Sequence, residues 1–128
     1  MADNLYNNTV LDHYKNPRNM GVLEEADISY EDAGTVCGDE VRIDLCVAEE
    51  RVVAIAFSGQ GCAISQASAS ILTSLIAGKL LVEVNQLTSG ELLEAIGIGA
   101  GSARVECALL SLRVLRVGLN GPDYIPDE

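Results

Sequence analysis

Two runs of alternating residues constrain the fold of this chain more than any other feature. The first occupies residues 40–48 and the second 53–57, with the polar connection Glu49-Glu50-Arg51 between them. Successive side chains of a strand point to opposite faces, so each run predicts a strand with one apolar face. The short connection predicts that the two strands pair as an antiparallel hairpin. The apolar members of the runs are Val41, Ile43, Leu45 and Val47, followed by Val53, Ile55 and Phe57.

The pattern changes at Cys62, where the hairpin gives way to a predicted helix. The glycine-containing residues 58–61 are expected to end the second strand. From Ala63 to Ala77 no breaker interrupts the chain, and Gly78 and Lys79 supply an end signal. Further helices are predicted at 3–15, at 91–96 after a cap at Ser89, and at 104–119, and a short strand at 30–32.

The length of the chain and its net charge limit the functions that it can have. The 128 residues fit one domain, 1–128, and the formal net charge is −11. Binding to a phosphate backbone needs clustered Lys and Arg, so nucleic acid is not expected as a partner, and neither is an anionic membrane surface. A basic protein or a metal cation would be attracted. The N-terminus lacks the pattern of a signal peptide and no stretch is long enough to cross a membrane, which predicts a cytoplasmic protein.

Three of the four cysteines stand where metal chemistry is plausible for a reduced thiol. Cys37-Gly38-Asp39 offers a thiol and a carboxylate from one turn. Cys62 and Cys107 fall near the starts of predicted helices, where unsatisfied amides favour the thiolate, and Arg104 would favour it further at Cys107. We therefore regard Cys37, Asp39, Cys62 and Cys107 as candidate metal ligands.

Other polar residues have simpler interpretations. Cys46 shares a strand face with Arg42 and Asp44, which favours a structural role. His13 is expected in the last turn of its helix, where a cation is favourable without any metal. Glu106 could be an exchanging ligand, although a first-turn acid complements the helix dipole. The glycine-rich run 97–101 is expected to be a connector, because it follows a helix and lacks the lysine of a phosphate-binding loop.

Four ordered blocks resemble a known family. The chain is similar to the iron-sulfur scaffold proteins of the IscU type, to the N-terminal domain of NifU and to SufU. The blocks that carry the resemblance are Leu11 to Gly21, Cys37-Gly38-Asp39, Gly59 to Ser70, and Arg104 to Ala108.

The resemblance implies an α+β fold, in which a three-stranded antiparallel sheet packs against several helices, as in the IscU and SufE-like proteins. It also implies a scaffold and carrier rather than an enzyme. Cys37, Cys62 and Cys107 would accept sulfur from a cysteine desulfurase, bind iron, and hold a transient 2Fe-2S cluster for transfer to apo-proteins. Asp39 would be the labile ligand, and zinc could occupy the cluster-free form.

Two features leave an alternative open. Residues 100–104 stand where the IscU type has a Leu-Pro-Pro-Val-Lys segment, so an Hsp70 chaperone partner is doubtful. The block around Cys62 and Arg104 looks more like SufU, which implies a zinc-dependent sulfurtransferase that accepts persulfide from the desulfurase. A structural zinc module is a third reading. A homo-oligomer is compatible with each of them.

Overall fold

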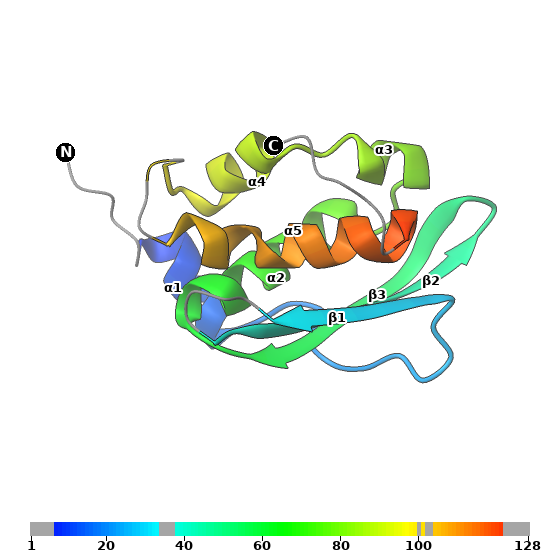
Figure 1. The fold of residues 1–128 in the computed structure, drawn as a ribbon, viewed down its shortest axis with the longest axis horizontal. Coiled ribbons are helices and arrows are strands. Elements are labelled where there is room, and N and C mark those ends of the chain that lie inside the picture. Colours follow the sequence, from blue (N-terminus) through cyan, green and yellow to red (C-terminus); the bar gives the residue numbers. More distant parts are fainter. Residues whose placement is uncertain (1–6, 34–37, 100, 102–103, 122–128) are drawn as a thin grey trace.

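The helices gather on one side of a twisted sheet in the computed structural model (Figure 1). The structure describes residues 7–33, 38–99, 101 and 104–121. Within these ranges, no helix has the length and apolar character needed to cross a membrane. In chain order the elements are α1 (Asn8–Lys15), β1 (Ile28–Ala33), β2 (Glu40–Ala48), β3 (Arg51–Gln60), α2 (Ala63–Ile76), α3 (Leu81–Asn85), α4 (Ser89–Ile96) and α5 (Val105–Asn120).

The sheet is antiparallel with the strand order β1-β2-β3. This confirms the predicted hairpin, in which Ile43 pairs with Phe57 across β2 and β3. Glu49 and Glu50 both have positive φ, 53° and 61°, which is the backbone that a two-residue hairpin turn requires.

The second strand ends within the expected segment 58–61, because β3 continues to Gln60. Gly59 pairs with Val41 at a φ of 142°. A Cβ atom on Gly59 would lie 2.0 Å from the carbonyl oxygen of Glu40. The glycine therefore allows two strands to approach closely rather than ending one.

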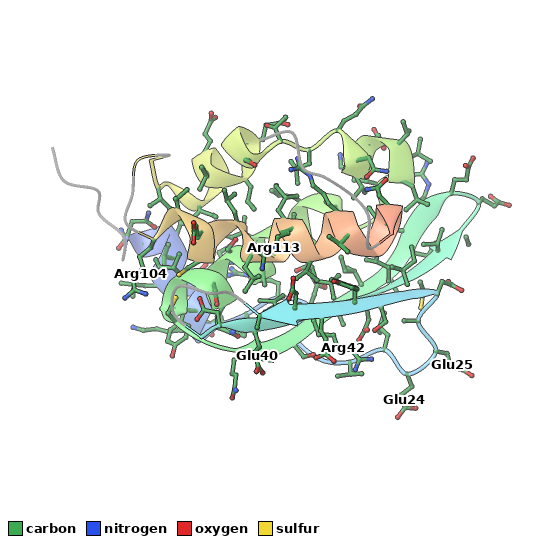
Figure 2. The ribbon with its side chains drawn as sticks, in the orientation of Figure 1. Glu24, Glu25, Glu40, Arg42, Arg104 and Arg113 are labelled. Atoms are coloured by element: carbon green, nitrogen blue, oxygen red, sulfur yellow. The ribbon has the colours of Figure 1, made fainter. Side chains whose placement is uncertain are left out.

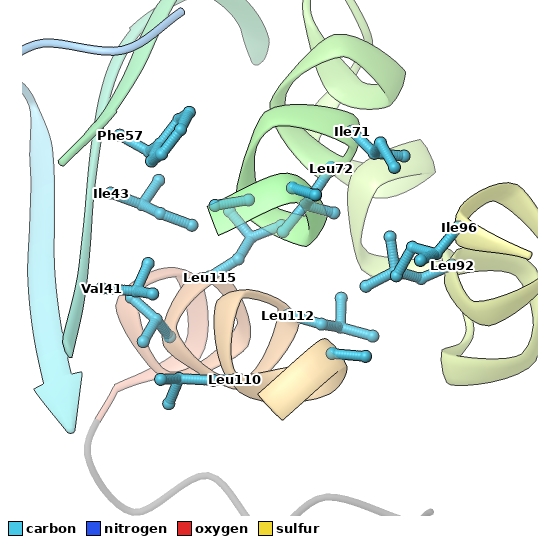
Figure 3. Close-up of a cluster of buried hydrophobic side chains, with 14 of the residues drawn as sticks. Val41, Ile43, Phe57, Ile71, Leu72, Leu92, Ile96, Leu110, Leu112 and Leu115 are labelled. Carbon is cyan, nitrogen blue, oxygen red and sulfur yellow. The ribbon is translucent and has the colours of Figure 1, made fainter. Parts of the chain in front are cut away.

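The core lies between the sheet and the two long helices. Figure 3 shows Ile43 and Phe57 of the sheet facing Leu72 of α2 and Leu115 of α5. The two helices also contact each other through small residues: the Ser68 hydroxyl donates to the carbonyl of Ala108 and lies 3.3 Å from the Ser111 hydroxyl. This close packing sets the start of α5 beside the start of α2.

The region between α2 and α5 differs in detail from the sequence prediction. The short helix α3 was not predicted. The cap of α4 is Thr88 rather than Ser89: its hydroxyl accepts the amide hydrogen of Glu91, whose carboxylate in turn accepts the amide of Thr88. Gly97, at a φ of 88°, ends α4.

Asn7 ties the start of α1 to the end of α4. Its side-chain oxygen accepts the amide hydrogen of Val10 at 2.9 Å, which caps α1. Its side-chain nitrogen donates to the carbonyls of Ile96 and Gly97 at 3.0 and 3.2 Å. One side chain thus satisfies polar groups at two helix ends that are far apart in sequence.

Replacing Asn7 by Ala should lower the free energy of unfolding by about 1–2 kcal/mol, because a cap and a connection between helices are lost together. Urea denaturation followed by circular dichroism measures this change. Asn8→Ala is the matched control, since Asn8 is exposed in the first turn of α1 and should alter stability by less than about 0.5 kcal/mol. Equal effects of the two substitutions would contradict the role of Asn7.

Candidate metal centre

Three metal-ligating side chains meet at one end of the molecule. One ligand atom from each of Asp39, Cys62 and Cys107 lies within 4.8 Å of the other two. Asp39 directly precedes β2, Cys62 is the N-cap of α2, and Cys107 lies in the first turn of α5. The packing of α2 and α5 on the sheet therefore converges the three residues. Cys37, the fourth predicted ligand, lies outside the described residues.

The carboxylate of Asp39 is fully buried. Its Oδ1 accepts the backbone amide hydrogen of Cys62 at 2.8 Å, and its Oδ2 lies 3.6 Å from Cys62 Sγ. The carboxylate thus satisfies an amide at the N-terminus of α2, a position that favours negative charge. Asp39 and Cys62 are held together before any metal binds.

Gly61 makes this close approach possible. Its φ is 150°, and a Cβ atom there would lie 2.2 Å from Asp39 Oδ1. Gly38, with a φ of 67°, supplies the turn on the other side of the carboxylate. The turn at Gly38 is expected from the sequence, whereas the role of Gly61 is not.

Cys62 presents a free thiol at the beginning of a helix of 14 residues. Its side chain makes no capping hydrogen bond, so the sulfur is not occupied by the helix. The thiolate is the form of such a side chain that binds metals. The predicted position of Cys62 at a helix start is confirmed.

Cys107 is buried and takes part in a disulfide bond in this structure, so it must be reduced before it can bind a metal, and Arg104 approaches it from the same turn. The distance between Arg104 Nη1 and Cys107 Sγ is 4.0 Å, so the guanidinium points toward the sulfur, an orientation that the sequence alone left open. Figure 2 shows Arg104 at the end of the molecule where α5 begins. A positive charge there attracts anionic sulfur species.

The remaining candidates do not join this group of described residues. Cys46 lies in the middle of the sheet, opposite Ala54, and its sulfur is 3.8 Å from the carbonyl oxygen of Glu25. Glu106 is exposed on the first turn of α5 and is not among the converging ligand atoms. His13 is also absent from the group.

His13 instead connects α1 to α2. Its Nδ1 lies 2.8 Å from the hydroxyl of Ser70, which also accepts the amide hydrogen of Arg18. Burial lowers the pKa of His13, and the positive charge of Arg18 lowers it further. His13 thus lies in the last turn of α1, as expected, but its lowered pKa favours the neutral ring over the cation.

The donor set of the centre suits a soft or borderline metal. Once Cys107 is reduced, two sulfurs and one carboxylate oxygen within 4.8 Å match the ligands of tetrahedral zinc and of iron-sulfur clusters. An oxygen ligand bonds iron less tightly in such a set than a thiolate does and exchanges more readily. The arrangement can therefore hold a metal and also release it.

Known proteins share this sequence and fold. A family model described as the NifU-like N terminal domain matches residues 5–124. The zinc-dependent sulfurtransferase SufU of Bacillus subtilis is 34% identical over 91% of this chain and 90% of its own. The iron-sulfur cluster assembly scaffold protein IscU 1 of Archaeoglobus fulgidus is 35% identical over 88% of this chain and 72% of its own.

A solved structure gives the same match. A protein assigned to iron-sulfur cluster assembly in the SUF system of Fervidobacterium islandicum superposes with a TM-score of 0.78 at 27% identity, covering 90% of this chain and 96% of its own. The agreement confirms the three-stranded antiparallel sheet with its helical layer as an α+β fold of this kind.

Replacing Gly61 by Ala should weaken zinc binding at least about tenfold and lower the free energy of unfolding by at least about 2 kcal/mol, because the new methyl group displaces the Asp39 carboxylate. Calorimetric titration with zinc measures the affinity. Gly21→Ala is the matched control: Gly21 has the same φ of 150° but nothing within 4 Å of its Cβ position. Equal zinc affinities for the two variants would show that the contact with Asp39 has no role in metal binding.

As the pH falls, protonation of His13 should destabilise the fold before protonation of the carboxylates does. The folded pKa of His13 lies below its ordinary value of 6.5, so the unfolded chain takes up the proton first and stability falls as pH drops below about 6.5. For Asp44, burial raises the pKa but hydrogen bonds from Ser29, Arg42 and the Leu23 amide lower it overall, so its contribution is lost only below about 3.8. Denaturant titrations at pH 7.5 and 5.0 should show a smaller loss for His13→Gln than for the wild type, and an equal loss would contradict the assignment.

Proposed function

Because the chain belongs to the family of NifU-like N-terminal domains, we propose that it is a scaffold on which 2Fe-2S clusters are assembled and from which they pass to apo-proteins. The observation that carries this proposal is the meeting of Asp39, Cys62 and Cys107 at one end of the fold. Iron and sulfur are the substrates of such a scaffold, and the chain acts as a carrier rather than as an enzyme. A cysteine desulfurase supplies the sulfur, and the cytoplasm is the compartment in which the reaction takes place.

The four sequence-predicted ligands have different roles in this proposal. Cys37, Cys62 and Cys107 accept sulfur and hold iron as thiolates. Cys37 is included among these ligands because it lies two residues before Asp39 in the chain. Asp39 is the exchangeable ligand, because its carboxylate is a harder donor than the thiolates. Its hydrogen bond to the Cys62 amide keeps it in place after the cluster leaves.

A zinc-dependent sulfur relay is the second candidate, and a specific observation favours it. The SufU relative carries that description, and Arg104 lies 4.0 Å from Cys107 Sγ, where it would stabilise a terminal persulfide anion. In this reading zinc occupies the same donor set and the chain accepts sulfur without building a cluster. The two candidates share a site but differ in the product that leaves it.

Anaerobic reconstitution separates the two candidates. The chain is incubated with ferrous iron, cysteine and a cysteine desulfurase, and the visible spectrum is followed before and after addition of an apo-ferredoxin. The scaffold reading requires a 2Fe-2S spectrum that moves to the ferredoxin. Tight zinc, no cluster and faster desulfurase turnover would establish the relay instead. Cys62→Ala should abolish the cluster, whereas Cys46→Ala, which lies outside the group of donor atoms, should retain it.

Replacing Asp39 by Ala should slow the loss of the reconstituted cluster several-fold, because the exchangeable oxygen ligand is removed. The measurement is the half-life of the visible absorption in the presence of an apo-ferredoxin. Glu106→Ala is the matched control, since Glu106 is an exposed carboxylate adjacent to Cys107 in the sequence. If Asp39→Ala loses its cluster as fast as the wild type, Asp39 is not the labile ligand; if Glu106→Ala traps it, that role belongs to Glu106.

A further inference from the structure

A groove with an apolar floor lies among the C-terminal end of α2, α3 and α4. Two adjoining cavities of about 330 and about 300 Å³ share Leu75, Leu87 and Glu91 in their walls. Leu75 is 38% exposed, which is high for a leucine on a helix that is otherwise mostly buried. In Figure 1, α3 and α4 lie on the side of the helical layer that faces away from the sheet.

The rim of this groove carries more negative than positive charge. Glu83, Glu91 and Glu94 line it, and Lys79 is the cation among its lining residues. Within the part of the chain that the structure describes, none of the three carboxylates forms an ion pair. Glu83 and Glu91 also accept the backbone amide hydrogens of Leu80 and Thr88 at the helix starts. An apolar floor below a rim of net negative charge is complementary to a segment that is apolar on one face and cationic at its edges.

The walls of the groove are fixed from behind by α5. The guanidinium of the buried Arg116 donates to the carbonyl of Leu87 at 2.6 Å. Asn120 donates to the side-chain oxygen of Asn85 at 3.1 Å. These contacts hold the connection between α3 and α4 in place without a ligand, so binding would cost little reorganisation.

We propose that this groove docks a cationic amphipathic segment of a partner protein. Apolar side chains of the segment cover Leu75 and Leu87, and its Lys or Arg side chains approach the rim carboxylates. A second copy of this chain fits poorly, because the net charge of −11 opposes self-association through an acidic rim. An anionic membrane surface is disfavoured by the same repulsion.

The groove is separate from the metal centre, so this inference goes beyond the proposed function and does not rest on it. Cys62 caps the first turn of α2 and Leu75 belongs to its last turn. At a rise of about 1.5 Å per residue, the two positions are about 20 Å apart along the helix. A partner in the groove would therefore not cover the metal centre.

The test uses a defined peptide as the probe. A 14-residue peptide of Leu and Lys, with Leu on one helical face, is titrated into the isotopically labelled full chain and followed by amide NMR shifts. We expect saturable shifts centred on Leu75, Leu87 and Ala95. A peptide of equal charge with Ser in place of Leu should bind at least about tenfold more weakly, because the apolar floor then has no partner.

Matched variants test whether the peptide binds in the groove. Leu75→Lys and Glu94→Lys should each reduce affinity for the Leu-Lys peptide at least about fivefold. Val53→Lys and Glu24→Lys introduce the same charge changes at exposed positions of the sheet side and should change it less than about twofold. Figure 2 shows Glu24 below the sheet, opposite α3 and α4.

Three results would overturn the proposal. The first is shifts that spread over the whole acidic surface, and the second is equal binding of the Leu and Ser peptides. The third is a set of groove shifts that appears on concentrating the chain alone, which would identify a second copy as the occupant. Unchanged thermal unfolding of each variant ensures that a loss of binding reports on the groove and not on misfolding.

Discussion

The hydrogen bond from the Cys62 amide to the Asp39 carboxylate is the interaction on which the functional end of this molecule depends. It joins the residue before β2 to the N-cap residue of α2. A hydrogen bond to a buried carboxylate contributes about 1.5–3 kcal/mol, and the same group would be costly to bury without it. Because the bond uses the carboxylate as a helix cap, one residue serves the fold and the metal centre together.

Much of the fold follows from patterns within short stretches of sequence. The hairpin of β2 and β3 was predicted from period-two alternation, and α2 from an unbroken run after Cys62. Features that depend on a second segment were not predicted. Gly59 resembles a strand terminator in sequence, yet its function is to admit the Glu40 carbonyl from the neighbouring strand. The helix α3 has five residues, which is too short a stretch for a helical pattern to be recognised in the sequence.

The candidate site shows the same division between local and through-space information. Cys62 and Cys107 were assigned to helix starts from the sequence, and both lie there. That they meet Asp39 was implied by family resemblance and not by spacing, since 45 positions separate the two cysteines. The dependence of the site on Gly61 appears only when the backbone is seen against the Asp39 carboxylate. A glycine beside a cysteine carries no signal of this contact in a single sequence.

The way the core is built argues against a metal that only supports folding. Structural zinc modules are unfolded without their metal, because they bury too little apolar surface to fold alone. Here Phe57, Leu72 and Leu112 belong to a continuous core that connects the sheet, α2 and α5. Of the described candidate ligands, Cys107 belongs to this core and Cys62 packs against it. The Asp39 carboxylate is held by the Cys62 amide and needs no metal to stay in place. A fold that positions its ligands by packing can gain and lose its metal without unfolding, and this property is what a scaffold or a sulfur relay requires.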